Sequence, residues 1–470
     1  MLAKSIALKA LNAALATGGD YAEIYVERNR SSAIGLDNGR VEGASGLLTF
    51  GAGIRILKGF SSVYGFTSDL SAKNLVAFAS KLASGFEGER VITVETIKKQ
   101  GVNVINPIKK PLLEVPAEDK IAYLKECHEI TKGVDPRIVR VINNFGCYHK
   151  DIELFIAEGK EARYYENFEE RGRLTMVAFA ADKTENRFET AFSGPGRFGG
   201  WEYFTDELNY KEKARITGEK AIRLLSAKEC PSGRYPVVIG NGWGGVLFHE
   251  ACGHPLEASA TAKGLSCFSD SIGKPIASPI VSAYDDGTIV NEWGSNNIDS
   301  EGVPTQKVQL IKDGICTAFL VDRANGRRLN MEPSGCCRRQ NYKNAPTSRM
   351  SNTYIAAGKD NPEDIIADTK LGIYVVDFGG GSVEPTTGEF NFSASEAYII
   401  RDGKVCEPVK GCTLIGTGQE VLFNIDRVGN DLALGQGMCG ASSGSIPVDV
   451  GQPTIRLKEI TVGGRGGKLE

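Results

Sequence analysis

Asn-Gly and Asp-Gly pairs set between stretches of alternating apolar residues constrain the fold of this 470-residue chain more than any other feature. Such pairs are favoured where a two-residue hairpin turn requires positive φ. One pair lies in the first half, and the others follow Pro231, where glycine becomes dense: Asn38-Gly39, Asp286-Gly287, Asp313-Gly314 and Asp402-Gly403. We therefore predict a β-rich second half that is built from hairpins and has few helices.

The first half combines helix and strand patterns. Apolar residues recur at helical spacing from Ile6 to Leu15, and Gly18-Gly19 ends this predicted helix. Further helices are predicted at 72–84 and 117–132, and short strands joined by tight turns at 21–27, 34–41 and 47–56. The fold class that follows is α+β, with a mixed α/β N-terminal part.

A charged, glycine-poor segment from Asp206 to Lys228 shows helical spacing and is predicted to bridge two domains. A chain of this length is too long for one ordinary core. We predict an N-terminal α/β domain at 1–226 and a β-rich domain at 227–470. The second domain carries the histidine-bearing helix described below.

Composition argues against several classes of protein. The net charge of -3 and the pI near 6.0 are not those of a surface committed to nucleic acid. No apolar run approaches the ~18 residues of a membrane span. The 11 cysteines form no CxxC pair, which favours reduced thiols and a cytoplasmic location. The basic stretch from Arg323 to Arg349 is interpreted as a solvated face.

The stretch GVLFHEACGHPLEAS at 245–259 carries the strongest chemical signal. It holds two of only four histidines, His249 and His254, with Glu250 beside the first. Adjacent histidine and glutamate in an apolar, glycine-flanked turn are expensive to bury without a purpose. Three interpretations are open, namely a metal site, a dinucleotide-binding turn, and a core helix whose histidines are satisfied by hydrogen bonds.

The dinucleotide-binding interpretation rests on GNGWGG at 240–245, which matches GxGxxG after a strand-like run. A Rossmann unit requires a second parallel strand that ends in an acidic residue about 20 positions later. Here that region reads HPLEASATAKGLSC and is interrupted by Pro255. An oxidoreductase is therefore the weaker alternative.

The metal interpretation must explain an unusual spacing, because the motif is HExxxH and not HExxH. On a regular α-helix a five-residue step turns roughly 140° about the axis, so the two rings would diverge. Gly253 weakens the helix, and Pro255 disfavours α geometry at His254. We therefore expect His254 at the helix exit, with its ring folded back toward His249 and with Glu250 as the general base.

Two histidines are too few for zinc, which takes three protein ligands plus water in catalytic sites and four ligands in structural ones. Cys252 lies about 60° from His249 on a helix, and Cys439 lies in the glycine-rich GQGMCG. The residues alone leave the choice between these cysteines open. A structural zinc in a protein that binds or regulates a partner is the alternative to an enzyme.

The stretch HEACGHPLEA, together with GMCGASSGSIPVDVGQPTIRLKEITVGG at 437–464, resembles the TldD/PmbA family of metalloproteases and its TldD-type subunit in particular. The stretches at 295–315, 338–355 and 377–404 agree with this. The resemblance implies a zinc peptidase with His249 and His254 as zinc ligands, Glu250 as the catalytic glutamate and Cys439 as the third ligand. PmbA-type subunits lack the HExxxH triplet.

The resemblance also implies unfolded or flexible peptides as substrates, and a dimer formed with a second copy or with a PmbA-type subunit. Threonine, tyrosine and serine alternate with other residues at 348–355. This segment is either a sheet edge to which an extended peptide adds or an ordinary core strand. On the first hypothesis the substrate-binding residues are Arg349, Met350, Ser351, Asn352 and Thr353.

Overall fold

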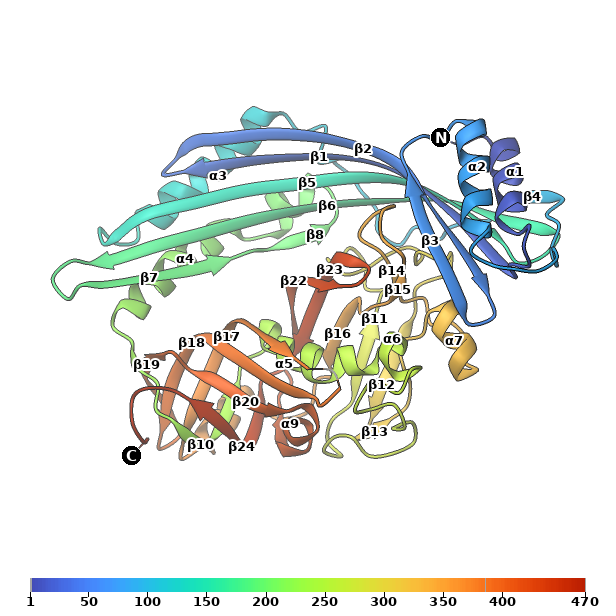
Figure 1. The fold of residues 1–470 in the computed structure, drawn as a ribbon. Coiled ribbons are helices and arrows are strands. Elements are labelled where there is room, and N and C mark those ends of the chain that lie inside the picture. The colour runs from blue at the N-terminus through green and yellow to red at the C-terminus, as the bar shows by residue number, and fades with distance from the viewer. Residues whose placement is uncertain (1, 385, 470) are drawn as a thin grey trace.

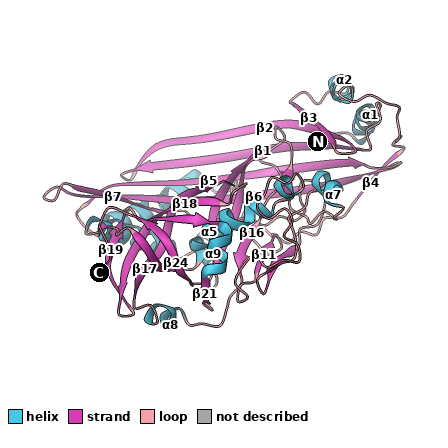
Figure 2. Cartoon of the chain, turned by 60° about the horizontal axis from the view of Figure 1, so that its bottom comes forward, coloured by secondary structure: helices cyan, strands magenta, loops and turns pink. Residues whose placement is uncertain are grey.

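The computed structural model describes residues 2–384 and 386–469. A large sheet from the N-terminal half extends over a C-terminal half that contains two further large sheets and one two-stranded sheet (Figure 1). Short helices lie within the C-terminal half, whereas the longer helices belong to the N-terminal half (Figure 2). The α+β fold class with a β-rich C-terminal part is confirmed.

The N-terminal sheet has the order β3-β2-β1-β5-β6-β4, and β7 and β8 also pair with β6. Its strands are β1 Tyr21–Asp37, β2 Arg40–Lys58, β3 Ser61–Thr67, β4 Thr96–Lys99, β5 Ile138–Ala157, β6 Glu161–Asp182, β7 Arg187–Ser193 and β8 Gly196–Phe198. Strands are confirmed at 21–27, 34–41 and 47–56, but they are not short, because the first two ranges and the last belong to the long strands β1 and β2 on either side of the turn at Asn38-Gly39. Polar residues between these ranges stay in the ladder because β1 pairs with β2 along its whole length and with β5 from Ala22 to Asp37.

Four helices accompany this sheet in two pairs. Helix α1 Lys4–Ala14 packs against α2 Ala72–Ala83, and α3 Ala117–Lys132 packs against α4 Tyr210–Leu225. These are the helices that the apolar spacing predicted. Lys220 of α4 forms an ion pair of 2.6 Å with Asp377 of the C-terminal half, so α4 contacts both halves. Among the described residues, no helix is long and apolar enough to cross a membrane.

The C-terminal half contains an eight-stranded sheet and a six-stranded sheet. The first consists of β9 Lys228–Glu229, β10 Gly233–Ile239, β17 Leu371–Val383, β18 Glu389–Arg401, β19 Lys404–Lys410, β20 Thr413–Thr417, β21 Ile425–Val428 and β24 Ile455–Gly463. The second has the order β13-β12-β11-β16-β23-β22. Its strands are β11 Ala283–Asp286, β12 Lys307–Lys312, β13 Ile315–Cys316, β16 Asn352–Ile355, β22 Ala433–Ala441 and β23 Gly444–Gln452.

The remaining elements of this half are short. Strands β14 Cys337–Arg338 and β15 Thr347–Ser348 pair with each other. The helices are α5 Val246–Phe248, α6 Ala258–Thr261, α7 Arg323–Leu329, α8 Pro362–Ala367 and α9 Gly418–Asn424. A single large apolar core joins α5 to strands of both sheets, with Phe248, Leu310 and Val375 among its buried residues.

Three of the four predicted hairpin turns are confirmed. Asn38, Asp313 and Asp402 adopt φ of 46°, 47° and 48°, and the glycine after each also has positive φ. The hairpin predicted at Asp286-Gly287 is wrong, because Asp286 pairs with Lys307 and residues 287–306 form a long connection. The Asp286 carboxylate instead accepts hydrogen bonds from the amide and the hydroxyl of Thr288.

The prediction of a solvated basic face at 323–349 is also wrong for three of its arginines. Arg338, Arg339 and Arg349 are buried, with exposed fractions of 6%, 5% and 0%. Buried carbonyl oxygens and carboxylates accept their hydrogen bonds, as in the contacts of Arg338 to the carbonyls of Met350 and Pro447. Pairing of this kind is what makes a buried guanidinium tolerable.

Candidate metal centre

The two motif histidines lie on a π-turn. Helix α5 continues into a π-helical segment, His249–Gly253, and then into a 3-10 turn, His254–Leu256. The backbone N–H of His254 donates to the carbonyl oxygen of His249, five residues earlier. This wider turn places residues five apart on one face, whereas an α-helix would separate them by about 140°.

The expectation that Pro255 moves His254 away from α geometry is wrong, since His254 has φ -59° and ψ -44°. Its ring nevertheless lies beside that of His249, as expected. The backbone forms a wider, π-helical turn at His249–Gly253 and remains a right-handed helix through His254. Gly253 contributes through packing, because a Cβ built there would lie 2.1 Å from the Met350 sulfur. The π-turn therefore packs closely against the chain just before β16.

Cys439 reaches the same point from strand β22. Its Sγ lies 3.3 Å from His249 Nε2 and 3.1 Å from His254 Nε2. The two imidazole rings are nearly perpendicular, at 85°, with centroids 5.0 Å apart. The potential ligand atoms of these three residues all lie within 4.8 Å of one another. Cys252, the other candidate, is instead part of the apolar core.

The electrostatics of the three groups favour a thiolate. Burial alone would raise the pKa of the Cys439 thiol, but the neighbouring His249 and His254 outweigh it and lower this pKa to about 3. Burial likewise opposes protonation of His254, yet the carboxylate of Glu257 and the Cys439 sulfur raise its pKa well above the usual value. A thiolate is the form of cysteine that binds metal.

Glu250 lies beside the cluster at the start of the π-turn. Its Oε2 is 3.8 Å from His254 Nε2, and 23% of its side chain is exposed. The carboxylate therefore borders the point where the three ligand atoms meet and can still be reached from solvent. That combination suits a group that exchanges protons with a bound reactant.

Glu257 is a residue that sequence reasoning missed. Its carboxylate lies 3.3 Å from His254 Nδ1, on the side of the ring away from Cys439, and its side chain is 6% exposed. A carboxylate on the second nitrogen fixes the orientation of a ligating imidazole and increases its basicity. The i, i+3 spacing from His254 was the available signal.

Arg349 was predicted to bind substrate, but it is fully buried next to the backbone of Cys439. Its guanidinium donates to the carbonyl of Cys439, the hydroxyl of Ser443 and the carbonyl of Gly444. Its Nε lies 3.9 Å from the carboxylate of Glu257. Arg349 thus connects the hairpin that carries Cys439 with the turn that carries the histidines.

The sheet-edge hypothesis for 348–355 is wrong, because β16 lies between β11 and β23 and is buried along its length. Ser351 and Thr353 donate their hydroxyls to the Asp285 carboxylate, and the Asn352 amide donates to Asp286 and Ser295. Met350 packs on Gly253. The substrate role of Arg349, Met350, Ser351, Asn352 and Thr353 depended on a free edge and loses its basis.

The strand that carries Cys439, β22, lies at one edge of that sheet, and β13 lies at the other. The carbonyls of Gln436 and Gly437 on β22 accept hydrogen bonds from Arg173 and Trp293. A cleft of about 770 Å³ is lined by residues 433–436 of β22 and by Trp243, which precedes α5. The same cleft is bordered by Phe192 of β7 and Lys220 of α4. The segments that precede His249 and Cys439 in the chain therefore both form walls of this cleft.

The donor set fits zinc. Two imidazole nitrogens and one thiolate match the three protein ligands of a catalytic zinc site, which leaves one position open. The Nδ1 atom of His254 is held by Glu257, so its Nε2 is the atom that faces the sulfur. The dinucleotide alternative would require a second parallel strand soon after the glycine-rich turn. The parallel neighbour of β10 is instead β17, which begins only at Leu371.

Comparison with known proteins covers nearly the whole chain. Residues 22–84, 110–225 and 232–464 match models of PmbA/TldA metallopeptidase domain 1, central domain and C-terminal domain. A metalloprotease TldD homolog of Haemophilus influenzae is 36% identical over 95% of this chain and 93% of its own length. One from Buchnera aphidicola (Schizaphis graminum) is 35% identical with the same coverage.

Solved structures share the fold. A putative modulator of a DNA gyrase from Thermotoga maritima superposes with a TM-score of 0.77 at 20% identity, covering 94% of this chain and 96% of its own. TldE from Thermococcus kodakarensis superposes with a TM-score of 0.73 at 18% identity, covering 95% and 97%.

Proposed function

The chain belongs to the PmbA/TldA metallopeptidase family and is a metalloprotease, and on this premise we propose that it hydrolyses peptide bonds with zinc held by His249, His254 and Cys439. The observation that carries the proposal is the convergence of two Nε2 atoms and one Sγ across a π-turn and a distant strand. The thiolate is the form in which cysteine binds a metal, and the two imidazoles beside Cys439 stabilise it.

A bound zinc ion supplies a Lewis acid that polarises the scissile carbonyl and lowers the pKa of a water molecule toward about 7. Glu250 accepts a proton from the attacking water and later donates it to the leaving amine. Its carboxylate borders the three ligands and remains partly exposed, which supports this role. Glu257 and Arg349 act behind the ligands, holding the His254 ring and the Cys439 backbone in place.

The substrates that the cleft fits are unfolded or flexible peptides. An extended segment lying along residues 433–435 would point toward Cys439, which is four residues, or about 13 Å, further along β22. Recognition along a strand uses main-chain groups and so selects weakly among sequences. An extended peptide would therefore add to the edge of β22, and not to residues 348–355.

The partner that we propose is a second subunit of the same family, either another copy or a PmbA-type chain, in the cytoplasm. Strand β3 pairs with β2 only from Ala52 to Lys58, so within the described part of the chain the outer edge of β2 before Ala52 has no strand neighbour. Leu47 and Leu48 on that stretch are 61% and 63% exposed. An exposed apolar strand edge is a surface that proteins usually cover.

The test is cleavage of an unfolded peptide by the purified chain, alone and with a PmbA-type chain. We expect cleavage that stops on chelation, returns with zinc and is absent from Glu250→Gln. Retained cleavage by a Glu250→Gln protein that holds its full zinc would contradict the assigned base. Lack of cleavage under every one of these conditions would contradict the proposed activity.

A further inference from the structure

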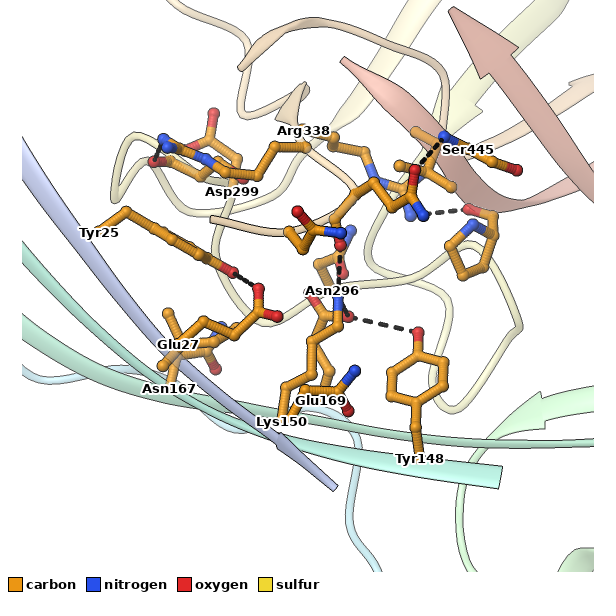
Figure 3. A pocket seen from close by; sticks show the side chains of 18 of the residues that line it. Tyr25, Glu27, Tyr148, Lys150, Asn167, Glu169, Asn296, Asp299, Arg338 and Ser445 are labelled. Carbon is orange, nitrogen blue, oxygen red and sulfur yellow. Dashed lines mark hydrogen bonds and ion pairs between the residues drawn. The ribbon is translucent and has the colours of Figure 1, made fainter. Parts of the chain in front are cut away.

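Lys150 and Glu169, in a cavity between the N-terminal sheet and the C-terminal half, have partners within the protein. This cavity has a volume of about 360 Å³, and side chains from both halves face one another across it (Figure 3). Lys150 donates to the carbonyl of Gln340 and lies 3.7 Å from Glu169, which accepts from Arg171. These charges join the two halves of the chain, and a different cavity offers a charge to a ligand.

The cleft beside β22 has an excess of positive charge. Among the described residues that line it, three are basic and one is acidic: Arg173, Lys213, Lys220 and Asp377. Lys220 is neutralised, since its ammonium lies 2.6 Å from the Asp377 carboxylate and 3.6 Å from that of Glu396. Lys213 is exposed on α4, where water solvates its charge. Arg173, on β6, is therefore the charge that this cleft can present to a ligand.

Main-chain carbonyls from both halves of the chain hold the Arg173 guanidinium at the wall of the cleft. Its Nε donates to the carbonyl of Gly194 at 3.0 Å, and its Nη2 donates to the carbonyl of Gln436 at 3.2 Å. Its third nitrogen, Nη1, has no hydrogen-bond partner among the described residues and is not buried. A half-buried guanidinium that is fixed in this way is preorganised to bind an acceptor in the cleft.

The charge of Arg173 is not neutralised by its surroundings. Burial lowers the pKa of Arg173, and the acid that opposes this effect is Asp449. Asp449 is itself fully buried, and its burial together with the neighbouring Glu292 raises its pKa, which favours its neutral form. Arginine nevertheless stays protonated at neutral pH. Its guanidinium is therefore available to an anion in the cleft.

Arg173 lies at a defined distance from the metal centre along β22. Gln436, whose carbonyl it binds, precedes Cys439 by three residues, or about 10 Å of strand. A peptide that extends along residues 433–435 and on to the metal would pass this guanidinium about three of its own residues from the scissile bond. Because Arg173 already occupies the Gln436 carbonyl, the contact that remains for the peptide there is through a side chain or a chain end.

We propose that Arg173 is a specificity-determining residue that binds a carboxylate of the peptide substrate, about three residues from the bond that is cleaved. An acidic side chain or the carboxyl end of the peptide can supply this group, since both present two oxygens to the planar guanidinium. The inference rests on the proposed function, to which it adds one position of side-chain selectivity in an otherwise main-chain mode of recognition.

The test is the binding of dansyl-labelled dodecapeptides of alanine, serine and glutamine to zinc-loaded Glu250→Gln protein, followed by fluorescence anisotropy. Both ends are blocked, and one central residue is either glutamate or glutamine. We expect the glutamate peptide to bind roughly tenfold more tightly, the value of one charge-assisted hydrogen bond. The glutamine peptide with a free carboxyl end is the second arm, and a gain in that arm alone would identify the chain end as the source of the carboxylate.

Variants in the same background identify the anchor. Arg173→Gln should bind the glutamate and glutamine peptides equally, with an affinity for the glutamine peptide near that of the parent. Arg173→Lys keeps the charge and should retain part of the preference. Lys213→Gln is the matched control, because it removes one positive charge from the cleft but leaves the guanidinium in place. It should retain the preference for glutamate.

Cleavage by the parent enzyme tests the position of the contact. The cut should fall about three residues from the glutamate and should move with it when the glutamate is shifted along the peptide. A cut whose position ignores the glutamate would contradict the proposed distance from the metal.

Three binding results would overturn the proposal. They are equal affinity for all three peptides, an equal loss of affinity for the glutamate and glutamine peptides in Arg173→Gln, and an equal loss of the preference in Lys213→Gln and Arg173→Gln. The second result would mean that Arg173 only supports the cleft wall. Carboxylate-dependent binding by a protein that never cleaves a peptide would instead contradict the proposed function alone.

Discussion

The backbone amide of His254 donates to the carbonyl of His249, and this single hydrogen bond makes a five-residue spacing usable for two ligands on one helical turn. The π-turn turns both Nε2 atoms toward Cys439 Sγ, at 3.3 and 3.1 Å. π-Turns are rare and occur frequently at functional sites. The spacing in the motif is therefore explained by backbone geometry.

Glu250→Gln should retain zinc and lose peptide cleavage by a factor of ~10² to 10⁴, the usual contribution of positioned proton transfer. The reason is that Glu250 borders the ligands without being one of the three that converge. Zinc content by elemental analysis and turnover of a fluorogenic unfolded peptide are the two measurements. If Glu250→Gln loses its zinc, the carboxylate is a ligand and the assignment of roles fails.

Cys439→Ser should lower zinc affinity at least tenfold, because the hydroxyl replaces a thiolate at the meeting point of the two imidazoles. Cys252→Ser is the matched control. It makes the same sulfur-to-oxygen change at a cysteine three residues after His249. Because Cys252 lies in the apolar core, this variant should retain zinc. Competition with a chelating dye measures both affinities. The reverse pattern would identify Cys252 as the ligand.

Gly253→Ala should destabilise the protein by about 1 to 3 kcal/mol and weaken zinc binding, because the new methyl group would overlap the Met350 sulfur. Met350→Ala removes that sulfur, so the double variant should regain zinc affinity relative to Gly253→Ala. Urea denaturation and zinc competition test both effects. Equal zinc affinity in Gly253→Ala and the parent would show that this contact does not hold the π-turn.

Arg349→Met should weaken zinc binding by about 10- to 100-fold, in the range found for residues that orient metal ligands. The substitution keeps an apolar stem of similar length but removes the bonds to the Cys439 and Gly444 carbonyls. Glu257→Gln should weaken zinc binding through the His254 ring in the same manner. If both variants bind zinc as the parent does and lose only peptide affinity, Arg349 contacts substrate after all.

Acid should destabilise the contact between the two halves of the chain. Burial alone would raise the pKa of Glu23, but Arg55, Arg339 and the Tyr21 hydroxyl lower it from 4.5 to about 2. A carboxyl with a depressed folded pKa contributes stability above its unfolded pKa and loses it as pH falls through the folded value. The free energy of unfolding should therefore fall between about pH 4.5 and 2, on the order of 3 kcal/mol from this group.

Denaturation at stepped pH in Glu23→Gln and Glu42→Gln separates this group from the rest. Glu23→Gln should unfold more easily at neutral pH, by about 3 to 5 kcal/mol, and show a flatter dependence in the acid range. The exposed Glu42 should contribute no such change. An acid dependence that is identical in all three proteins would exclude Glu23 as its source.

Features decided by neighbouring residues could be predicted from the sequence. The turns at Asn38, Asp313 and Asp402 follow from the tolerance of Asn, Asp and Gly for positive φ. Helices α2 and α3 follow from apolar spacing, since their inward faces are buried. The HExxxH triplet was recognisable because its residue types are costly to bury in an apolar turn.

Features decided by distant residues could not be predicted in this way. Pro255 was expected to end the helix at His254. Instead the helical turn widens before His254, where Gly253 packs against the distant Met350. Arg349 looked like part of a solvated face because its acceptors, the carbonyls of Cys439 and Gly444, are about ninety positions away. Residues alone also left Cys439 and Cys252 as equal candidates.

X-ray absorption at the zinc edge of the purified chain tests the central claim most directly. The account predicts one zinc per chain with a single sulfur at about 2.3 Å and two imidazole nitrogens at about 2.0 to 2.1 Å. Cys439→Ser should remove the sulfur from this spectrum. A shell of nitrogen and oxygen alone in the parent protein, or a sulfur that persists in Cys439→Ser, would contradict it.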